Sequence, residues 1–164
     1  MAPSSFRLSQ GETTMDLILW RHADARDGVP DMERALTDKG QKQARSMADW
    51  LLPRLPGDAR ILVSPATRAI STADALGRDY EVVPEIAPGA DGVHVLAAAG
   101  WPDASGTVLV VGHQPTLGEA ACLLLFGEAR PLSMKKAGVL WLTNRVRGNQ
   151  PQTVLKAAMT VEMV

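Results

Sequence analysis

The chain has 164 residues, a formal net charge of −1 at pH 7, 46% hydrophobic and 21% charged residues. This length predicts one domain with a sizeable core, and this charge gives no overall field that would attract nucleic acid or a membrane surface. No apolar run approaches the roughly 20 residues that a membrane span needs. We therefore expect neither nucleic-acid nor membrane partners.

Composition indicates where the folded domain begins and in which compartment the chain is expected. Residues 1–14 are polar, show no periodicity and lack the apolar core of a signal peptide, so we interpret them as a disordered leader before a single domain at 15–164. The only cysteine, Cys122, lies in an apolar run and is interpreted as a buried small hydrophobe. With no disulfide possible within the chain, the sequence fits a reducing cytoplasm.

The first elements are read from short apolar runs and capping residues. Residues 16–20 are apolar and short, as in a buried strand, and 23–35 carries the turn residues of a loop. Thr37 has the properties of a helix N-cap, since its hydroxyl can accept from a free amide of the first turn. An apolar stripe at helical spacing follows as far as Leu52, and Pro53 ends the predicted helix.

The remaining chain continues to alternate strands and helices. We expect strands at 60–64, 81–83, 107–111, 138–143 and 153–160, and helices at 65–76, 91–99 and 115–126. The last two strands are predicted to form a hairpin with its loop at 144–150. The alternation predicts an α/β fold with three layers, in which a mostly parallel central sheet carries helices on both faces.

Basic side chains follow three of the predicted strands where each strand ends. Arg21 and His22 follow the first strand, Arg68 follows the second, and His113 follows the strand at 107–111. The carboxyl ends of such strands meet at one edge, where open α/β sheets bind ligands. Arginine holds phosphoryl oxygens bidentately, and neutral histidine is a nucleophile. The pattern predicts a phosphate pocket with Arg21, Arg68 and His113 as clamps and His22 as the nucleophile.

Each of these residues also has a structural interpretation. Taken alone, an Arg-His pair occurs by chance, Arg68 is a solvated helix residue, and His113 caps the following helix. Their coincidence at three strand ends favours the functional interpretation. His94, by contrast, is interpreted as a helix residue, and three histidines without cysteine or carboxylate at ligand spacing predict no metal and no cofactor.

Four segments in order carry a family resemblance. Residues 19–23, 36–44, 64–73 and 111–115 resemble the four signature blocks of the histidine phosphatase superfamily, which has the phosphoglycerate-mutase-like fold. Only 44 residues separate Arg68 from His113, whereas larger relatives insert a helical region there. This minimal form resembles the SixA group, the phosphohistidine phosphatases of bacteria.

The resemblance implies a mechanism and a partner. His22 would be transiently phosphorylated, and water would then hydrolyse this phosphoenzyme, while Arg21, Arg68 and His113 bind the phosphate oxygens. The implied substrate is phosphohistidine on a phosphorelay protein or a phosphocarrier of sugar uptake, and the small size suits a monomer. The family usually has glycine after the histidine, whereas this chain has Ala23, which a negative φ would tolerate.

The proton donor and the substrate class stay open at this point. An alkyl phosphate releases a poor leaving group, so an acid is needed to protonate it. Glu85 and Asp91 are candidates for this acid, although the interpretation of both as solvated loop carboxylates is at least as good. Phosphohistidine releases an imidazole, which departs once its other nitrogen is protonated. The alternatives are a small-molecule phosphomonoesterase and a non-catalytic phosphoprotein-binding module; the intact set of four basic residues argues against the module.

Overall fold

The computed structural model describes residues 14–164, so the expected leader lies outside the described part except for Thr14. The described helices and strands, with η for a 3-10 helix, are β1 (Met15–Arg21), η1 (Asp31–Glu33), α1 (Asp38–Leu51), η2 (Leu52–Arg54), β2 (Arg60–Val63), α2 (Thr67–Asp74), β3 (Glu81–Val82), η3 (Pro84–Ile86), α3 (Gly92–Ala99), β4 (Gly106–Gly112), α4 (Thr116–Phe126), β5 (Val139–Arg147), β6 (Gln150–Met159) and η4 (Val161–Met163). Every strand and helix expected from the sequence is present. Among the described helices, none is long and apolar enough to cross a bilayer.

One mixed sheet in the order β3-β2-β4-β1-β5-β6 organises the molecule. The pairs β2–β3, β2–β4 and β1–β4 are parallel, whereas β1–β5 and β5–β6 are antiparallel. The prediction of a mostly parallel sheet is confirmed. The first strand lies inside the sheet, between β4 and β5, so its carboxyl end is surrounded by the ends of other elements.

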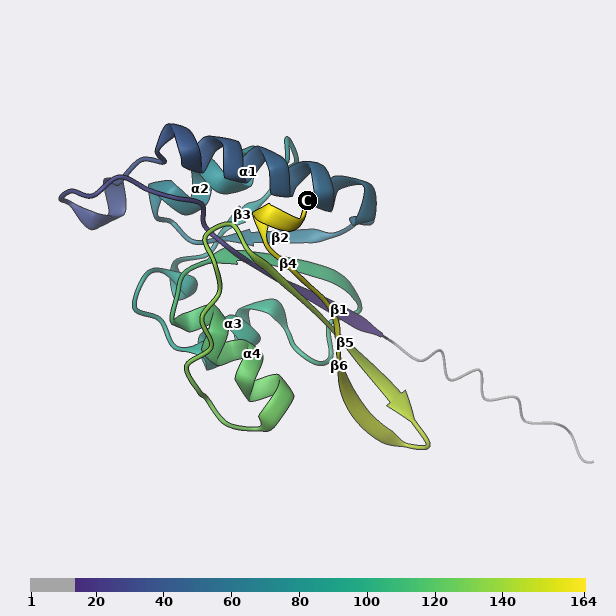
Figure 1. Ribbon diagram of the computed structural model, residues 1–164. Coiled ribbons are helices and arrows are strands. Elements are labelled where there is room, and N and C mark those ends of the chain that lie inside the picture. The colour runs from purple at the N-terminus through teal and green to yellow at the C-terminus, as the bar shows by residue number, and fades with distance from the viewer. Residues whose placement is uncertain (1–13) are drawn as a thin grey trace, which may run out of the picture.

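The residues of β1 contact helices on both faces of the sheet. Leu17 and Leu19 pack in the cluster that includes side chains of α3 and α4, and Ile18 and Trp20 pack in the cluster that includes side chains of α1 and α2. Figure 1 shows α1 and α2 on one side of the sheet and α3 and α4 on the other. Side chains alternate along a strand, so burial on both faces requires an unbroken apolar run. The predicted three-layer architecture is confirmed.

The hairpin loop is much shorter than the sequence predicts. Pairing between β5 and β6 continues to Arg147 opposite Gln150, so only Gly148 and Asn149 remain as the turn. Both have positive φ, 54° and 63°, as a two-residue hairpin turn requires. The expected loop at 144–150 is wrong because the polar residues of this stretch pair through backbone groups beyond the amino end of β1, where no core imposes an apolar pattern (Figure 1).

Candidate active site

The carboxyl end of the sheet holds a hollow of about 280 Å³. Its described lining residues are Arg21, His22, Ala25, Asp27, Arg34, Arg68, Pro88, His113, Gln114 and Lys136. All four basic residues predicted from strand ends are therefore together. Backbone pairing fixes the position of His22. Its amide donates to the main-chain oxygen of Gly112 at 3.0 Å and continues the ladder between β1 and β4.

One side-chain hydrogen bond ties this strand end to α2. The amide of Ala23 donates to Thr72 Oγ1 at 3.0 Å, and the Thr72 hydroxyl donates to the main-chain oxygen of Arg68 at 2.7 Å. Ala23 is fully buried, and it is not among the described residues with positive φ. An alanine thus fits where the family usually has glycine, and it leaves His22 beside α2.

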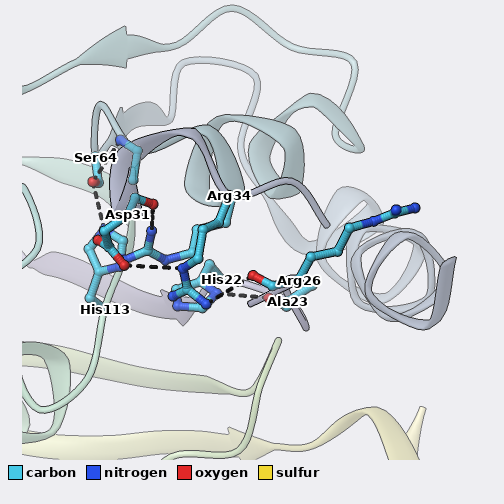
Figure 2. A network of polar contacts seen from close by, with 9 residues as sticks. His22, Ala23, Arg26, Asp31, Arg34, Ser64 and His113 are labelled. Atoms are coloured by element: carbon cyan, nitrogen blue, oxygen red, sulfur yellow. Dashed lines mark hydrogen bonds and ion pairs between the residues drawn. The ribbon is translucent and has the colours of Figure 1, made fainter. Parts of the chain in front are cut away.

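The ring of His22 has a defined proton position. Its Nδ1 lies 2.7 Å from the main-chain oxygen of Ala23, as Figure 2 shows. A carbonyl oxygen only accepts, so Nδ1 carries the proton and Nε2 keeps its lone pair. Burial, followed by the positive charges of Arg68 and Arg21, lowers the pKa of His22 to about 4. The imidazole is neutral at pH 7, with a free nitrogen available for attack on phosphorus.

His113 is oriented by Ser64. Its Nε2 lies 2.6 Å from Ser64 Oγ, which itself accepts from the amide of Ala66 at 3.3 Å (Figure 2). The hydroxyl proton is then free to be donated to Nε2, which assigns the ring proton to Nδ1. That Nδ1 is buried and has no hydrogen-bond partner within residues 14–164. Burial, and then the positive charge on His22 when it is protonated, lower the pKa of His113 to about 3, so this ring is also neutral at pH 7.

Arg68 is held by a residue of the loop after β1. The side chain of Arg68 is 5% exposed; its Nη1 donates to the main-chain oxygen of Asp31 at 2.9 Å, and its Nη2 pairs with Asp31 Oδ2 at 3.1 Å. Arg34 Nε pairs with the other carboxylate oxygen at 3.1 Å (Figure 2). The hydrogen bond from Arg68 is the main reason that the pKa of Asp31 is lowered. The loop thus supplies an anion to the arginine predicted to bind phosphate.

Two guanidinium nitrogens have no acceptor among the described residues. Arg21 Nη1 donates to the main-chain oxygen of Met134 at 2.6 Å, but the Nε atoms of both Arg21 and Arg68 are buried and unpartnered. Buried donors without acceptors are rare and unfavourable. Together with His113 Nδ1 they form three unused donors on residues that line the hollow, an arrangement that suits the oxygens of one anion.

The predicted proton donors lie elsewhere. Glu85 belongs to η3 and lines a separate pocket with Arg60 and His94. Asp91 is the N-cap of α3, where its amide donates to His94 Nδ1 at 3.3 Å. Neither residue lines the hollow, whereas Asp27 does. Their role as acids stays a prediction that this geometry does not support, and His94 is a helix residue as expected.

Sequence reasoning missed several residues of this region. Ser64 belongs to a signature-like segment but was not paired with His113, and Asp31 and Arg34 belong to a stretch interpreted only as a loop. Lys136 lines the hollow and pairs with Asp24.

Within residues 14–164, no three histidine, cysteine or carboxylate side chains gather as metal ligands would.

Two arginines and a neutral histidine with a free nitrogen define a site for handling phosphoryl groups. Comparison with known proteins agrees with this class. Residues 17–102 match the histidine phosphatase superfamily, branch 1. The phosphohistidine phosphatase SixA of Escherichia coli K12 is 34% identical over 128 residues, which cover 72% of this chain and 79% of that protein.

Other relatives cover more of the chain. An uncharacterized protein of Picosynechococcus is 35% identical over 152 residues, covering 85% of this chain and 91% of its own length. The structure of the protein histidine phosphatase SixA complexed with tungstate superposes with a TM-score of 0.72 at 27% identity, covering 90% of this chain and 97% of that one. The chain belongs to the histidine phosphatase superfamily, has its phosphoglycerate-mutase-like fold, and is a phosphatase.

Proposed function

We propose that the protein hydrolyses phosphohistidine on a protein substrate through a phosphorylated His22. The observation that carries the proposal is the hydrogen bond between His22 Nδ1 and the main-chain oxygen of Ala23, because it leaves Nε2 unprotonated inside a hollow lined by arginines. The similarity to a protein named phosphohistidine phosphatase supports the choice of substrate. Arg21, Arg68 and His113 bind the phosphoryl oxygens.

The first step transfers the phosphoryl group between two imidazoles. His22 Nε2 attacks phosphorus in line with the bond to the substrate nitrogen, which breaks as the new P–N bond forms. A substrate ring that carries a proton on its other nitrogen leaves as neutral imidazole. The proton on His22 Nδ1 stays in place and is stabilised by the oxygen of Ala23, so the step needs no separate acid.

The second step releases phosphate. Water attacks the phosphorus of phosphorylated His22, the P–N bond breaks, and the bonding pair returns to Nε2. Both protons of the water remain with the phosphate, which loses one to solvent according to pH. This sequence agrees with a hollow in which Asp27 is the only carboxylate among the described lining residues, and with Glu85 and Asp91 lying outside it.

The proposal also covers the domain organisation, oligomeric state and location of the protein. Residues 15–164 act as one domain and as a monomer, because strands from both halves of the chain share one sheet and one chain supplies all four basic residues of the hollow. A cytoplasmic location suits a sole cysteine, Cys122, that is buried in α4 and reduced.

The test measures phosphate release from a histidine-phosphorylated phosphotransfer protein, with p-nitrophenyl phosphate alongside and His22→Ala as the blank. We expect faster release from the phosphoprotein, no release by the variant, and an acid-labile, base-stable phosphoenzyme after rapid quenching. Release from the ester alone would favour a small-molecule phosphomonoesterase. Tight binding of the phosphoprotein without turnover would favour a binding module.

A further inference from the structure

Two exposed apolar side chains lie in the segment between β1 and α1, on either side of Asp31 along the chain, and Asp31 contacts Arg68 of the hollow. Val29 is 95% exposed, the most exposed large hydrophobic side chain in residues 14–164, and Met32 is 37% exposed. Scattered exposed hydrophobics are ordinary, so their position decides their meaning. Asp27 and Arg34 flank this pair in the chain and both line the hollow. Residues 29–32, here called the apolar tip, lie between these two lining residues in the chain and are joined to the hollow through the contact of Asp31 with Arg68.

The apolar tip is held in place despite its exposure. The amide of Arg26 donates to the oxygen of Ala35 at 2.8 Å and closes the base of the loop. Within the tip, Asp31 pairs with Arg34 and with the buried Arg68, both at 3.1 Å. Figure 1 shows this segment projecting from the body of the molecule, before α1. A loop fastened in this way presents its side chains with little loss of entropy on binding.

A small phosphorylated molecule would gain no binding energy from the apolar tip. The hollow of about 280 Å³ is lined mainly by charged and polar residues and can hold a phosphoryl group and an imidazole ring. When the imidazole belongs to a folded protein, the protein surface around that histidine must contact the surface around the hollow. Val29 and Met32 would then be removed from water, which stabilises the complex without demanding precise geometry.

We propose that the apolar tip docks a folded protein that presents its phosphohistidine next to an apolar surface patch. This inference rests on the proposed function and adds the partner-binding surface to it. The cationic hollow takes the phosphoryl group, and the tip selects the carrier. Because Asp31 joins the tip to Arg68, docking and phosphate binding occur on one connected unit.

The test compares phosphohistidine carried by a protein with free phosphohistidine. A histidine phosphotransfer domain and a sugar-uptake phosphocarrier are each phosphorylated with phosphoramidate, and free phosphohistidine serves as the small substrate. For the double variant Val29→Ser, Met32→Ser we expect kcat/KM on a phosphoprotein to fall by about tenfold, mainly through KM, as for loss of an interface anchor. The rate on free phosphohistidine should stay within about twofold of wild type.

Val146→Ser is the matched control. Val146 has 37% exposure and lies on β5 beyond the amino end of β1, away from the hollow. It should leave both rates unchanged. An unchanged rate of the double variant on both phosphoproteins, or an equal fall on free phosphohistidine, would overturn the docking proposal. Failure of the wild type on both phosphoproteins would overturn the protein-substrate proposal itself, which separates the two failures.

Discussion

At the scale of single residues, burial keeps His22 and His113 neutral, with pKa values lowered from 6.5 to about 4 and about 3. Between these values and 6.5 the unfolded chain binds more protons than the folded one. The stability that neutrality contributes is fully present above pH 6.5 and is lost as pH falls toward about 4 for His22 and about 3 for His113. At pH 5 the loss is roughly 2 kcal/mol for each histidine, as an order of magnitude.

This linkage predicts how stability responds to acid. From pH 7 to pH 5, the free energy of unfolding of the wild type should fall by more than that of His22→Gln, because glutamine does not titrate. Urea denaturation at the two pH values measures the difference. Equal losses in the two proteins would mean that His22 has an ordinary pKa in the folded state.

In the proposed mechanism, Asp31 competes with a bound phosphoryl group for Arg68. Asparagine at this position keeps an oxygen that accepts from Arg68 Nη2 and removes the negative charge. We expect Asp31→Asn to bind inorganic phosphate about threefold more tightly, since like charges near one guanidinium repel each other. The inhibition constant of phosphate measures this effect, with Asp38→Asn as a control, because Asp38 is exposed at the start of α1 and does not line the hollow. Weaker inhibition would instead identify the carboxylate as a positioning group for Arg68.

Single residues also mark where sequence reasoning succeeds. Arg21, His22, Arg68 and His113 were predictable because strand ends meet at one edge whatever the loops do. The contact of Arg68 with Asp31 joins residues 37 apart, and that of His113 with Ser64 joins residues 49 apart. Such partners depend on how loops fold over the edge, which no local pattern encodes.

At the scale of elements, α1 is packed against the loop that carries the apolar tip. Thr37 caps α1 by accepting from the amide of Gly40 at 2.9 Å, as predicted, and also donates to Asp24 at 2.7 Å. A Cβ on Gly40 would lie 1.9 Å from the main-chain oxygen of Asp24. Only glycine permits this approach between helix and loop.

Gly40→Ala should therefore lower the free energy of unfolding by about 1–3 kcal/mol, as other forced overpacking does. Gly57→Ala is the control, because a Cβ there meets nothing within 4 Å. Urea denaturation of both variants measures the difference. Equal stability of the two would show that the loop moves aside without loss.

The elements themselves were predictable where burial imposed a pattern. The stripe of α1 and the apolar run of β1 follow directly from the layers that they face. The far end of β5 and β6 lacks such a pattern, since residues beyond Thr143 leave the core and are held by backbone pairing and by polar contacts such as that from Arg145 Nε to Gln152 Oε1 at 3.2 Å.

At the scale of the whole molecule, we expect an anion that fills the hollow to bind the native state alone, because only folding brings the lining residues together. Phosphate at 100 times its dissociation constant would add about 2.7 kcal/mol of stability, which corresponds to roughly 5–10 °C in Tm for a chain of this size. The rise should be absent in Arg68→Gln, and sodium chloride at equal ionic strength should not produce it. Differential scanning fluorimetry measures both. A similar rise in the variant would indicate a general salt effect.

The strand order also governs when the site can exist during synthesis. Both neighbours of β1 come from the second half of the chain, since Met15 lies opposite Gly106 in β4 and Trp20 lies opposite Val139 in β5. β2 also needs β4 as its neighbour. Such long-range pairing delays folding. A nascent chain stalled at residue 105 would already contain Arg21, His22 and Arg68, yet lack the strand that brings them side by side.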